Sequence, residues 1–200
     1  MKLYLSPGAC SLADHIALHE ADLEFERVYV DLKAKRTDDG RDYATINPKG
    51  YVPALELDDG QLLTENIAIL SWAAAQAPDL APAGDMGRYR LLEMLAFIST
   101  EIHKAFKPYF AGGSDEEKGK AGEAIGRRLG YLAERMDGDF LFGSRFTVAD
   151  AYLFTMLTWA QHLELALPDP LPAYFARVTA RPCVIEALEH EAREPAQRAA

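Results

Sequence analysis

The chain has 200 residues and a formal net charge of −10 at pH 7, with 49% hydrophobic and 26% charged residues. This composition is ordinary for a globular protein, and the length allows one large domain or two small ones, each with a buried core. The negative charge argues against binding to nucleic acid and to anionic membrane surfaces, because both repel an acidic protein.

The sequence does not predict export or membrane insertion. No apolar run approaches the ~20 residues that a membrane-spanning helix needs. The first apolar residues are interrupted at once by Pro7-Gly8, unlike those of a signal peptide. Cys10 and Cys183 are far apart and form no Cys-x-x-Cys pair, so we expect reduced thiols. A cytoplasmic location is the resulting expectation.

Strand and helix patterns alternate at the start of the chain. Leu3-Tyr4-Leu5 predicts a strand, and Pro7-Gly8 predicts a turn after it. Apolar residues then recur at helical spacing from Ser11 to Ala21, and residues 25–32 predict a second strand. The strand-helix-strand order indicates a parallel pair of strands.

The pattern then changes to a hairpin followed by a helix. Residues 42–46 predict a short helix, residues 47–50 a turn, and residues 52–57 a strand. Asp58-Asp59-Gly60 predicts a hairpin turn into another short strand. Thr64 is expected to cap the helix that comes next.

A change of composition divides the chain. Residues 79–87 are rich in Pro, Ala, Gly and Asp and predict a linker. Beyond them only helical patterns occur, at 88–108, 115–137, 147–163, from Pro172 and from Pro182, with a terminal helix over 186–200. We therefore expect an α/β domain of βαβ-ββα order over residues 1–78 and an all-helical domain over residues 88–200.

Cys10 lies where the first strand, the turn and the first helix meet. The N-terminus of a helix stabilises a thiolate through its dipole and its free N–H groups, which favours a reactive thiol here. Free cysteines are also among the most often buried residues, so a structural role stays open. For Cys183, at an apolar helix start, the structural role is favoured.

A proline precedes the third predicted strand, in Tyr51-Val52-Pro53. Proline removes a hydrogen-bond donor from the strand. With a cis Val52-Pro53 bond, the backbone of Val52 would turn outward and pair with an extended ligand. A trans proline at the start of an edge strand is the commoner arrangement, and the sequence leaves both open.

Thr64-Glu65-Asn66 opens a helix directly after a strand. The free N–H groups there suit a ligand carboxylate, and Glu65 suits an ammonium group. A plain helix cap is the alternative. Taken together, a thiol, a backbone pairing site and a zwitterion clamp lie at three junctions of one α/β unit, where ligands gather. Glutathione, a thiol-bearing peptide with an α-amino acid end, would occupy all three.

The sequence resembles the beta-class glutathione S-transferases of bacteria over nearly its whole length. Five segments carry the resemblance. They are Ser6-Pro7-Gly8-Ala9-Cys10-Ser11-Leu12-Ala13, Asn47-Pro48-Lys49-Gly50-Tyr51-Val52-Pro53-Ala54-Leu55, Leu63-Thr64-Glu65-Asn66, Ser99-Thr100-Glu101-Ile102-His103-Lys104 and Arg145-Phe146-Thr147-Val148-Ala149-Asp150-Ala151-Tyr152. The first and fourth are specific to the class, the second and third are widespread in the superfamily, and the fifth is the capping motif of the superfamily's helical domain.

The resemblance implies a thioredoxin-like glutathione-binding domain, a helical domain, and a role for each matching position. Cys10, Ser11 and His103 would lie near the glutathione sulfur, with Cys10 able to form a mixed disulfide with it. The remaining glutathione contacts would come from Lys35, Val52, Pro53, Glu65, Asn66, Thr100, Glu101 and Lys104. The chain has Ala96 where relatives often carry an asparagine, so one outer hydrogen bond is lost or replaced.

The implied activity is addition of the glutathione sulfur to small hydrophobic electrophiles, in detoxification, with glutathione as co-substrate and no other cofactor. The electrophile site would be lined by Phe106, Tyr109 and Phe110, residues that are equally suited to the core. The resemblance also implies a homodimer. A thiol-disulfide transferase that uses Cys10, and a non-catalytic binder of hydrophobic ligands, are the alternatives.

One metal-binding pattern needs separate mention. His15 and His19 are spaced i, i+4 and could share a metal ion. No glutamate follows His15 as in an HExxH motif, and the sequence offers no evident third ligand. No metal site is therefore predicted.

Overall fold

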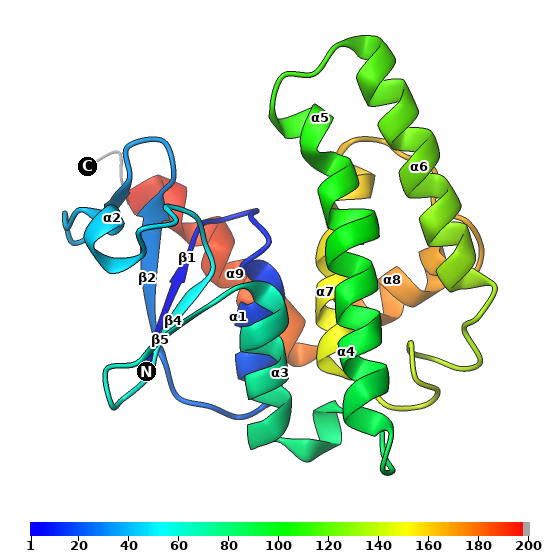
Figure 1. Cartoon of the computed structure of the whole chain (residues 1–200), viewed down its shortest axis with the longest axis horizontal. Coiled ribbons are helices and arrows are strands. Elements are labelled where there is room, and N and C mark those ends of the chain that lie inside the picture. The colour runs from blue at the N-terminus through cyan, green and yellow to red at the C-terminus, as the bar shows by residue number, and fades with distance from the viewer. Residues whose placement is uncertain (198–200) are drawn as a thin grey trace. The chain divides into compact units, whose positions relative to one another are not determined.

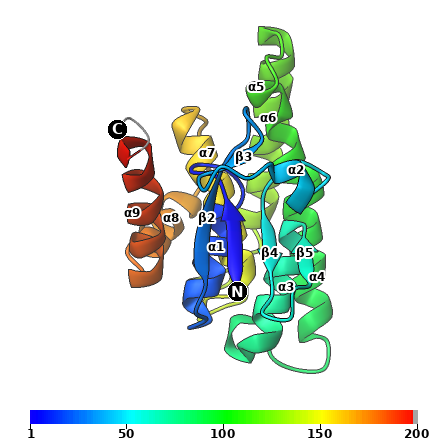
Figure 2. The ribbon, with the colours of Figure 1, turned by 90° about the vertical axis from the view of Figure 1, so that its left-hand side faces the viewer.

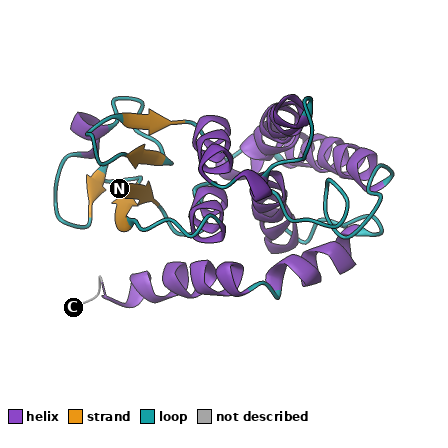
Figure 3. Ribbon diagram, turned by 90° about the horizontal axis from the view of Figure 1, so that it is seen from below, coloured by secondary structure: helices purple, strands orange, loops and turns teal. Residues whose placement is uncertain are grey.

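The computed structural model describes residues 1–197, and the side chains of residues 1–192. The chain divides into two compact units, residues 1–78 together with the segment from Ala180 onward, and residues 79–179. Figure 1 follows the chain through both, and Figure 3 shows that the strands belong to the unit that holds the N-terminus. Within the described residues, no helix is both long and apolar enough to span a membrane.

The first unit is built on one five-stranded sheet in the order β3-β2-β1-β4-β5. The bounds of its strands are β1 Lys2–Leu5, β2 Glu26–Asp31, β3 Arg36–Thr37, β4 Ala54–Glu56 and β5 Leu62–Thr64. β1 pairs with β2 in parallel, and β4 and β5 form an antiparallel hairpin beside β1. The predicted βαβ-ββα order is confirmed, while the two-residue strand β3 has no signal in the sequence.

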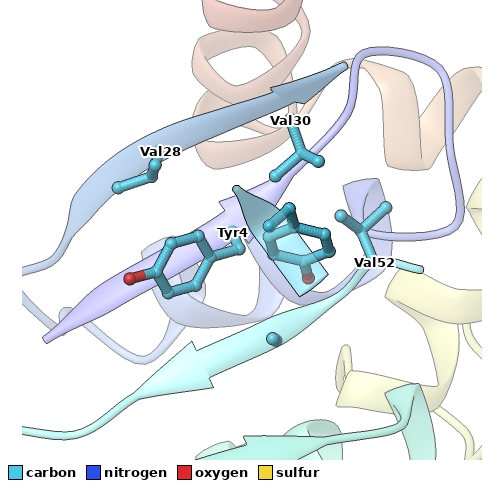
Figure 4. Packing of buried hydrophobic residues seen from close by; sticks show 6 residues of the cluster. Tyr4, Val28, Val30 and Val52 are labelled. Atoms are coloured by element: carbon cyan, nitrogen blue, oxygen red, sulfur yellow. The ribbon is translucent and has the colours of Figure 1, made fainter. Parts of the chain in front are cut away.

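β1 is central, and its residues are buried on both faces of the sheet. On one face, Tyr4 packs with Val28, Val30 and Val52, and with Tyr43 of α2 (Tyr43–Ile46), as Figure 4 shows for the labelled side chains. Because side chains alternate along a strand, Leu3 and Leu5 are buried on the opposite face. This double burial explains the uninterrupted apolar run Leu3-Tyr4-Leu5.

One helix of the first unit packs against two others. α1 (Leu12–Glu20) connects β1 with β2 and contacts both α3 (Asn66–Gln76) and α9 (Pro182–Gln197). Figure 2 shows α1 beside the strands. Arg181, just before α9, makes a bidentate ion pair with Glu20 at 2.6 and 2.7 Å. α9 thus packs with the first unit although it is the last helix in the sequence.

The second unit, in the described chain, is helical. Its elements are η1 Pro78–Leu80, which begins one residue before the unit, α4 Gly87–Phe97, η2 Ile98–Ile102, η3 His103–Phe106, α5 Lys107–Phe110, α6 Asp115–Ala133, α7 Val148–His162 and α8 Leu171–Thr179. The predicted single helix over 88–108 is in fact four successive helical pieces. The π-helical piece η2 falls on the Ser99–Lys104 motif, and π-helical turns occur often at functional sites.

Capping boxes begin two of these helices, and the one at Thr147 is the capping motif expected from the sequence. Ser114 and Glu117 cap α6, and Thr147 and Asp150 cap α7. The expected cap at Thr64 is wrong, because Thr64 ends β5 and Glu65 precedes α3 without a side-chain capping bond. The terminal helix predicted over 186–200 is present as part of α9, and residues 198–200 lie outside the described residues.

Candidate functional site

Three segments that are distant in the sequence meet at Cys10 in the first unit. Cys10 lies in the turn between β1 and α1, and its half-buried thiol donates to the carbonyl oxygen of Val52 at 3.5 Å. The amide Nδ2 of Asn66, at the start of α3, donates to the carbonyl oxygen of Cys10 at 2.9 Å. The sheet order β1-β4-β5 brings these strand ends together, so the predicted junctions do converge.

The Val52-Pro53 peptide bond is cis, which decides the question that the sequence left open. The preceding turn is held by Tyr51, whose carbonyl oxygen accepts from Asn47 Nδ2 at 2.8 Å and from Tyr43 OH at 3.1 Å. Val52 itself is buried. The backbone that leads into Val52 is therefore held by the buried side chains of Tyr43 and Asn47, and not by pairing with a neighbouring strand.

Glu65 presents an ionised carboxylate directly before α3. Its backbone has a φ of 77°, in the left-handed region that few non-glycine residues adopt. Tyr51 OH donates to its carboxylate at 2.7 Å, and the Lys49 ammonium group pairs with the same oxygen. Bonds from Lys49 and then Tyr51 lower the pKa of the Glu65 carboxyl group. A strained backbone supporting a fixed charge is typical of a binding site.

The thiol of Cys10 is protonated, contrary to the expectation from its place before a helix. Burial, and then the Asp14 carboxyl group, raise the pKa of Cys10 to about 12. Asp14 is fully buried on α1, where it accepts from Asn66 Nδ2 at 2.7 Å. Desolvation therefore outweighs the helix dipole here.

Alkylation tests this protonation state. We expect the rate at which iodoacetamide modifies Cys10 to rise continuously from pH 6 to pH 9, because only the thiolate reacts and the pKa of Cys10 is about 12. Mass spectrometry of the Cys10 peptide measures the rate, with Cys183 in the same digest as the reference. A rate for Cys10 that levels off below pH 8 would show a depressed pKa and contradict this prediction.

Ser11 and Lys35 serve neighbouring turns in this structure. Ser11 is fully buried, accepts from the Ser6 N–H at 3.2 Å and donates to the Ser6 carbonyl at 3.4 Å, which closes the turn around Cys10. Lys35 has a φ of 55° and its Nζ donates to the Gly50 carbonyl at 2.5 Å. Lys35 therefore lies against the turn that precedes Val52.

The predicted residues of the second unit lie along η2 and η3. His103 is half-buried, and its Nδ1 lies 2.7 Å from the hydroxyl oxygen of Tyr152 on α7. Burial lowers the pKa of His103 to about 4, so the imidazole is neutral near pH 7. Glu101 accepts from Arg128 of α6 at 2.7 and 2.8 Å.

Two further predicted residues of this segment are exposed. The Thr100 hydroxyl donates to the backbone carbonyl oxygen of Ala96 at 2.9 Å. The methyl side chain of Ala96 cannot make the hydrogen bond that an asparagine would make at this position. Lys104 is exposed to solvent on η3. Both side chains can therefore meet a ligand that approaches η2 and η3 from outside.

Four aromatic rings gather beside His103. Phe106 is fully buried, and its ring contacts those of Tyr109, Phe110 and Trp159. Phe110 is 58% exposed, which is unusual for so large an apolar side chain. Tyr109 donates its hydroxyl to the Lys118 carbonyl at 2.8 Å. In this arrangement Phe110 offers the accessible apolar surface, and Phe106 supports it from beneath.

Several residues of the site were not anticipated from the sequence. Lys49 and Tyr51 belong to the Asn47–Leu55 motif, but their convergence on Glu65 depends on the turn geometry. Asp14 is one helical turn after Cys10, which could have signalled a shared environment. Tyr152 follows the capping motif of α7, and nothing in its local sequence points to His103.

Comparisons with known proteins identify the family of the chain. The model of the glutathione S-transferase N-terminal domain matches residues 9–76, and that of the C-terminal domain matches residues 97–182. The curated glutathione S-transferase GstA of Escherichia coli O157:H7 is 46% identical over 198 residues, which cover 96% of this chain and 98% of that protein.

Two solved structures are similarly close. A sphingomonad glutathione S-transferase complexed with glutathione is 47% identical, with a TM-score of 0.89 over 96% of this chain and 100% of that one. A beta-class glutathione S-transferase of Sphingomonas chungbukensis is 48% identical, with a TM-score of 0.87 over 96% and 98% of the two chains. This protein therefore belongs to the glutathione S-transferase family, and it resembles the bacterial beta class.

Proposed function

We propose that the protein conjugates the thiol of glutathione to small hydrophobic electrophiles. The observation that carries this proposal is the convergence of Cys10, the cis Val52-Pro53 turn and the start of α3 in one unit. Family membership and the glutathione found with a sphingomonad relative support it.

The ends of glutathione have matching groups on the protein. The Glu65 carboxylate, fixed by Lys49 and Tyr51, is suited to the γ-glutamyl ammonium group, with Asn66 beside it. The backbone of Val52 is suited to pair with the cysteinyl unit in extended conformation. Lys35, next to the Gly50 turn, can reach the glycyl carboxylate. Pro53 fixes the direction in which Val52 is presented.

The chemical task is to make the thiolate of glutathione available at neutral pH. A free thiol has a pKa near ~8.5, so only about 3% is ionised at pH 7. Lowering that pKa by ~2 units needs about 2.7 kcal/mol of preferential stabilisation of the thiolate. A protonated Cys10, with its high pKa, can donate a hydrogen bond to that sulfur. We propose the same task for the neutral His103, with Thr100, Glu101 and Lys104 as outer contacts. Ser11 is buried and its hydroxyl donates to the Ser6 carbonyl oxygen, so we propose that it supports the sulfur site by closing the turn around Cys10.

The electrophile is proposed to meet the aromatic cluster of the second unit. Phe110 offers exposed apolar surface, and Tyr109 and Phe106 complete the wall. In functional terms we propose a glutathione-binding domain over residues 1–78, a linker over 79–87 and an electrophile-site domain from residue 88 onward. The predicted end of that domain at residue 200 is corrected to Thr179, because the segment from Ala180 onward groups with the first unit. No cofactor beyond glutathione is needed for the addition.

We infer that the protein acts as a homodimer in the cytoplasm, in detoxification. Tyr89 and Leu92 of α4 are 49% and 48% exposed, which supports a pairing surface on this helix.

Thiol-disulfide transfer through Cys10 is the second candidate, favoured by the Cys10 thiol beside the position that we propose for the glutathione sulfur. It is the weaker one, because attack on a disulfide requires a thiolate and the pKa of Cys10 is about 12.

Separate assays of the two activities on the same variants test the proposal. Wild-type protein is expected to conjugate glutathione to a chloronitrobenzene with saturation in glutathione. Cys10→Ala is expected to slow conjugation about 10-fold or more by removing one charge-assisted hydrogen bond, and Cys10→Ser to recover part of the rate. Cys183→Ala is the matched control and should behave as wild type. Turnover only with glutathionylated disulfides, abolished in Cys10→Ser, would instead establish the second candidate.

A further inference from the structure

Three histidines of the first unit lie together between two helices, apart from the residues assigned to glutathione. His15 and His19 come from α1, and His190 comes from α9. One ring nitrogen of each lies within 4.8 Å of those of the other two. The ring centroid of His15 is 5.0 Å from that of His19, and the ring centroid of His190 is 5.7 Å from both.

Two of these rings have a buried nitrogen that lacks a hydrogen-bond partner in the protein. His15 is fully buried, and neither its Nε2 nor the buried Nε2 of His19 makes a hydrogen bond. Burying a polar atom in this way costs about 1–3 kcal/mol for each group. Buried polar atoms of this kind call for an explanation, and an ion is one of the few available.

One nitrogen of each ring, Nδ1 of His15 and His19 and Nε2 of His190, lies on the side of a carboxylate. His15 Nδ1 lies 3.3 Å from Glu191 Oε1, and His19 Nδ1 lies 3.9 Å from Glu186 Oε2. His190 Nε2 lies 4.0 Å from the second oxygen of Glu186. Metal-binding histidines commonly direct one nitrogen to the metal and the other to a carboxylate, which fixes the tautomer and raises the basicity of the ligand. His15 already has this arrangement at 3.3 Å, whereas the separations of 3.9 and 4.0 Å at His19 and His190 are ion-pair distances that are longer than a hydrogen bond.

We propose that His15, His19 and His190 form a binding site for a first-row divalent metal ion, with Zn²⁺ as the preferred ion and a water molecule as the fourth ligand. Three imidazoles suit zinc, whereas Mg²⁺ and Ca²⁺ prefer oxygen ligands.

The rings must move closer to hold the ion. Zn–N bonds of about 2.0–2.1 Å in a tetrahedral site place the ligand nitrogens about 3.3 Å apart. The nitrogens lie within 4.8 Å of one another, so the largest separation has to shorten by no more than about 1.5 Å. His19 and His190 are only partly buried, with side chains 15% and 20% exposed, so they have room to rotate and leave an entry path.

The surroundings of the cluster are mixed in charge and polarity. The Phe25 ring lies in T-shaped contact with both His15 and His19, at centroid distances of 5.8 and 5.1 Å, and adds an apolar neighbour on that side. The positive charge of Arg27 opposes a bound cation, since burial and then this charge lower the pKa of His15. The carboxylate of Glu186 offsets that charge, whereas burial raises the pKa of Glu191 to about 7 and leaves its carboxyl group only partly ionised at neutral pH.

Metal titration of the untagged protein, without glutathione, tests the proposal. A Cys10→Ser, Cys183→Ser background removes both thiols as competing ligands. We expect calorimetry to give one Zn²⁺ per chain, Co²⁺ to give the intense visible absorption of a tetrahedral site, and Mg²⁺ to give no binding. His19→Gln and His190→Gln should each weaken Zn²⁺ binding at least 10-fold, and the exposed His162→Gln should leave it unchanged.

Further variants separate a site from a loss of structure. Glu191→Gln should weaken binding about 10- to 100-fold, as expected for a carboxylate that orients a ligand. Thermal unfolding of each metal-free variant identifies those that fail to fold. Because His19 and His190 are partly exposed, we expect their glutamine variants to fold. The proposal is overturned if folded wild-type protein binds no Zn²⁺, or if His19→Gln and His162→Gln bind it alike. Neither outcome bears on glutathione conjugation.

Discussion

Replacement of Glu65 by alanine is expected to weaken glutathione binding about 10- to 100-fold, with little change in stability. The carboxylate is exposed, ionised and held by Tyr51 and Lys49, so it would meet the ligand's ammonium group without further ordering. A hydrogen bond between charged groups contributes about 1.5–3 kcal/mol, which gives the expected range. Isothermal titration calorimetry with glutathione measures the effect directly.

The unusual backbone at this position needs its own control. Glu65 has a φ of 77°, which glycine adopts without strain. Glu65→Gly therefore removes the carboxylate while keeping the backbone, and it should lose as much affinity as Glu65→Ala. Asp59→Ala removes an exposed carboxylate from the β4–β5 turn and should leave affinity unchanged. If Glu65→Gly binds glutathione as tightly as wild type, the side chain is not the clamp.

Replacement of Asp150 by alanine is expected to destabilise the protein by about 4 kcal/mol or more. Its buried carboxyl group accepts from the Thr147 N–H and hydroxyl at 2.8 Å, from the Leu141 N–H at 2.9 Å and from Tyr174 OH at 3.0 Å. Alanine leaves these donors buried without an acceptor, at about 1–3 kcal/mol each. Urea unfolding of wild type and variant measures the difference.

The second capping box supplies the matched comparison. Glu117 accepts from Ser114 N–H and Oγ at 2.7 and 2.9 Å, but it lies in solvent at the start of α6. Glu117→Ala should therefore cost only about 1 kcal/mol, the usual value for an exposed cap. Equal losses for Asp150→Ala and Glu117→Ala would mean that burial and the extra donors contribute nothing.

The order of elements was predictable where local chemistry specifies it. Pro7-Gly8 and Asp58-Asp59-Gly60 end strands by backbone geometry, and Ser114 and Thr147 begin helices through their side chains. These signals act within a few residues, so a single sequence contains them. The confirmed βαβ-ββα order and the two capping boxes are of this kind.

Features that depend on distant contacts could not be predicted in the same way. The π-helical turn at Ile98–Ile102 shares its apolar periodicity with an ordinary helix. The high pKa of Cys10 results from burial and from Asp14, against the local effect of the helix N-terminus. His190 joins His15 and His19 only because α9 packs against α1. In each case the deciding interaction lies outside the segment in which the signal was sought.

A crystal structure of the protein with glutathione tests the central claim most directly. We predict that the glutathione sulfur lies within hydrogen-bonding distance of the Cys10 thiol, with the cysteinyl backbone paired to Val52 and the γ-glutamyl ammonium group on Glu65. Glutathione bound with its sulfur away from Cys10, or on another surface, would contradict the account.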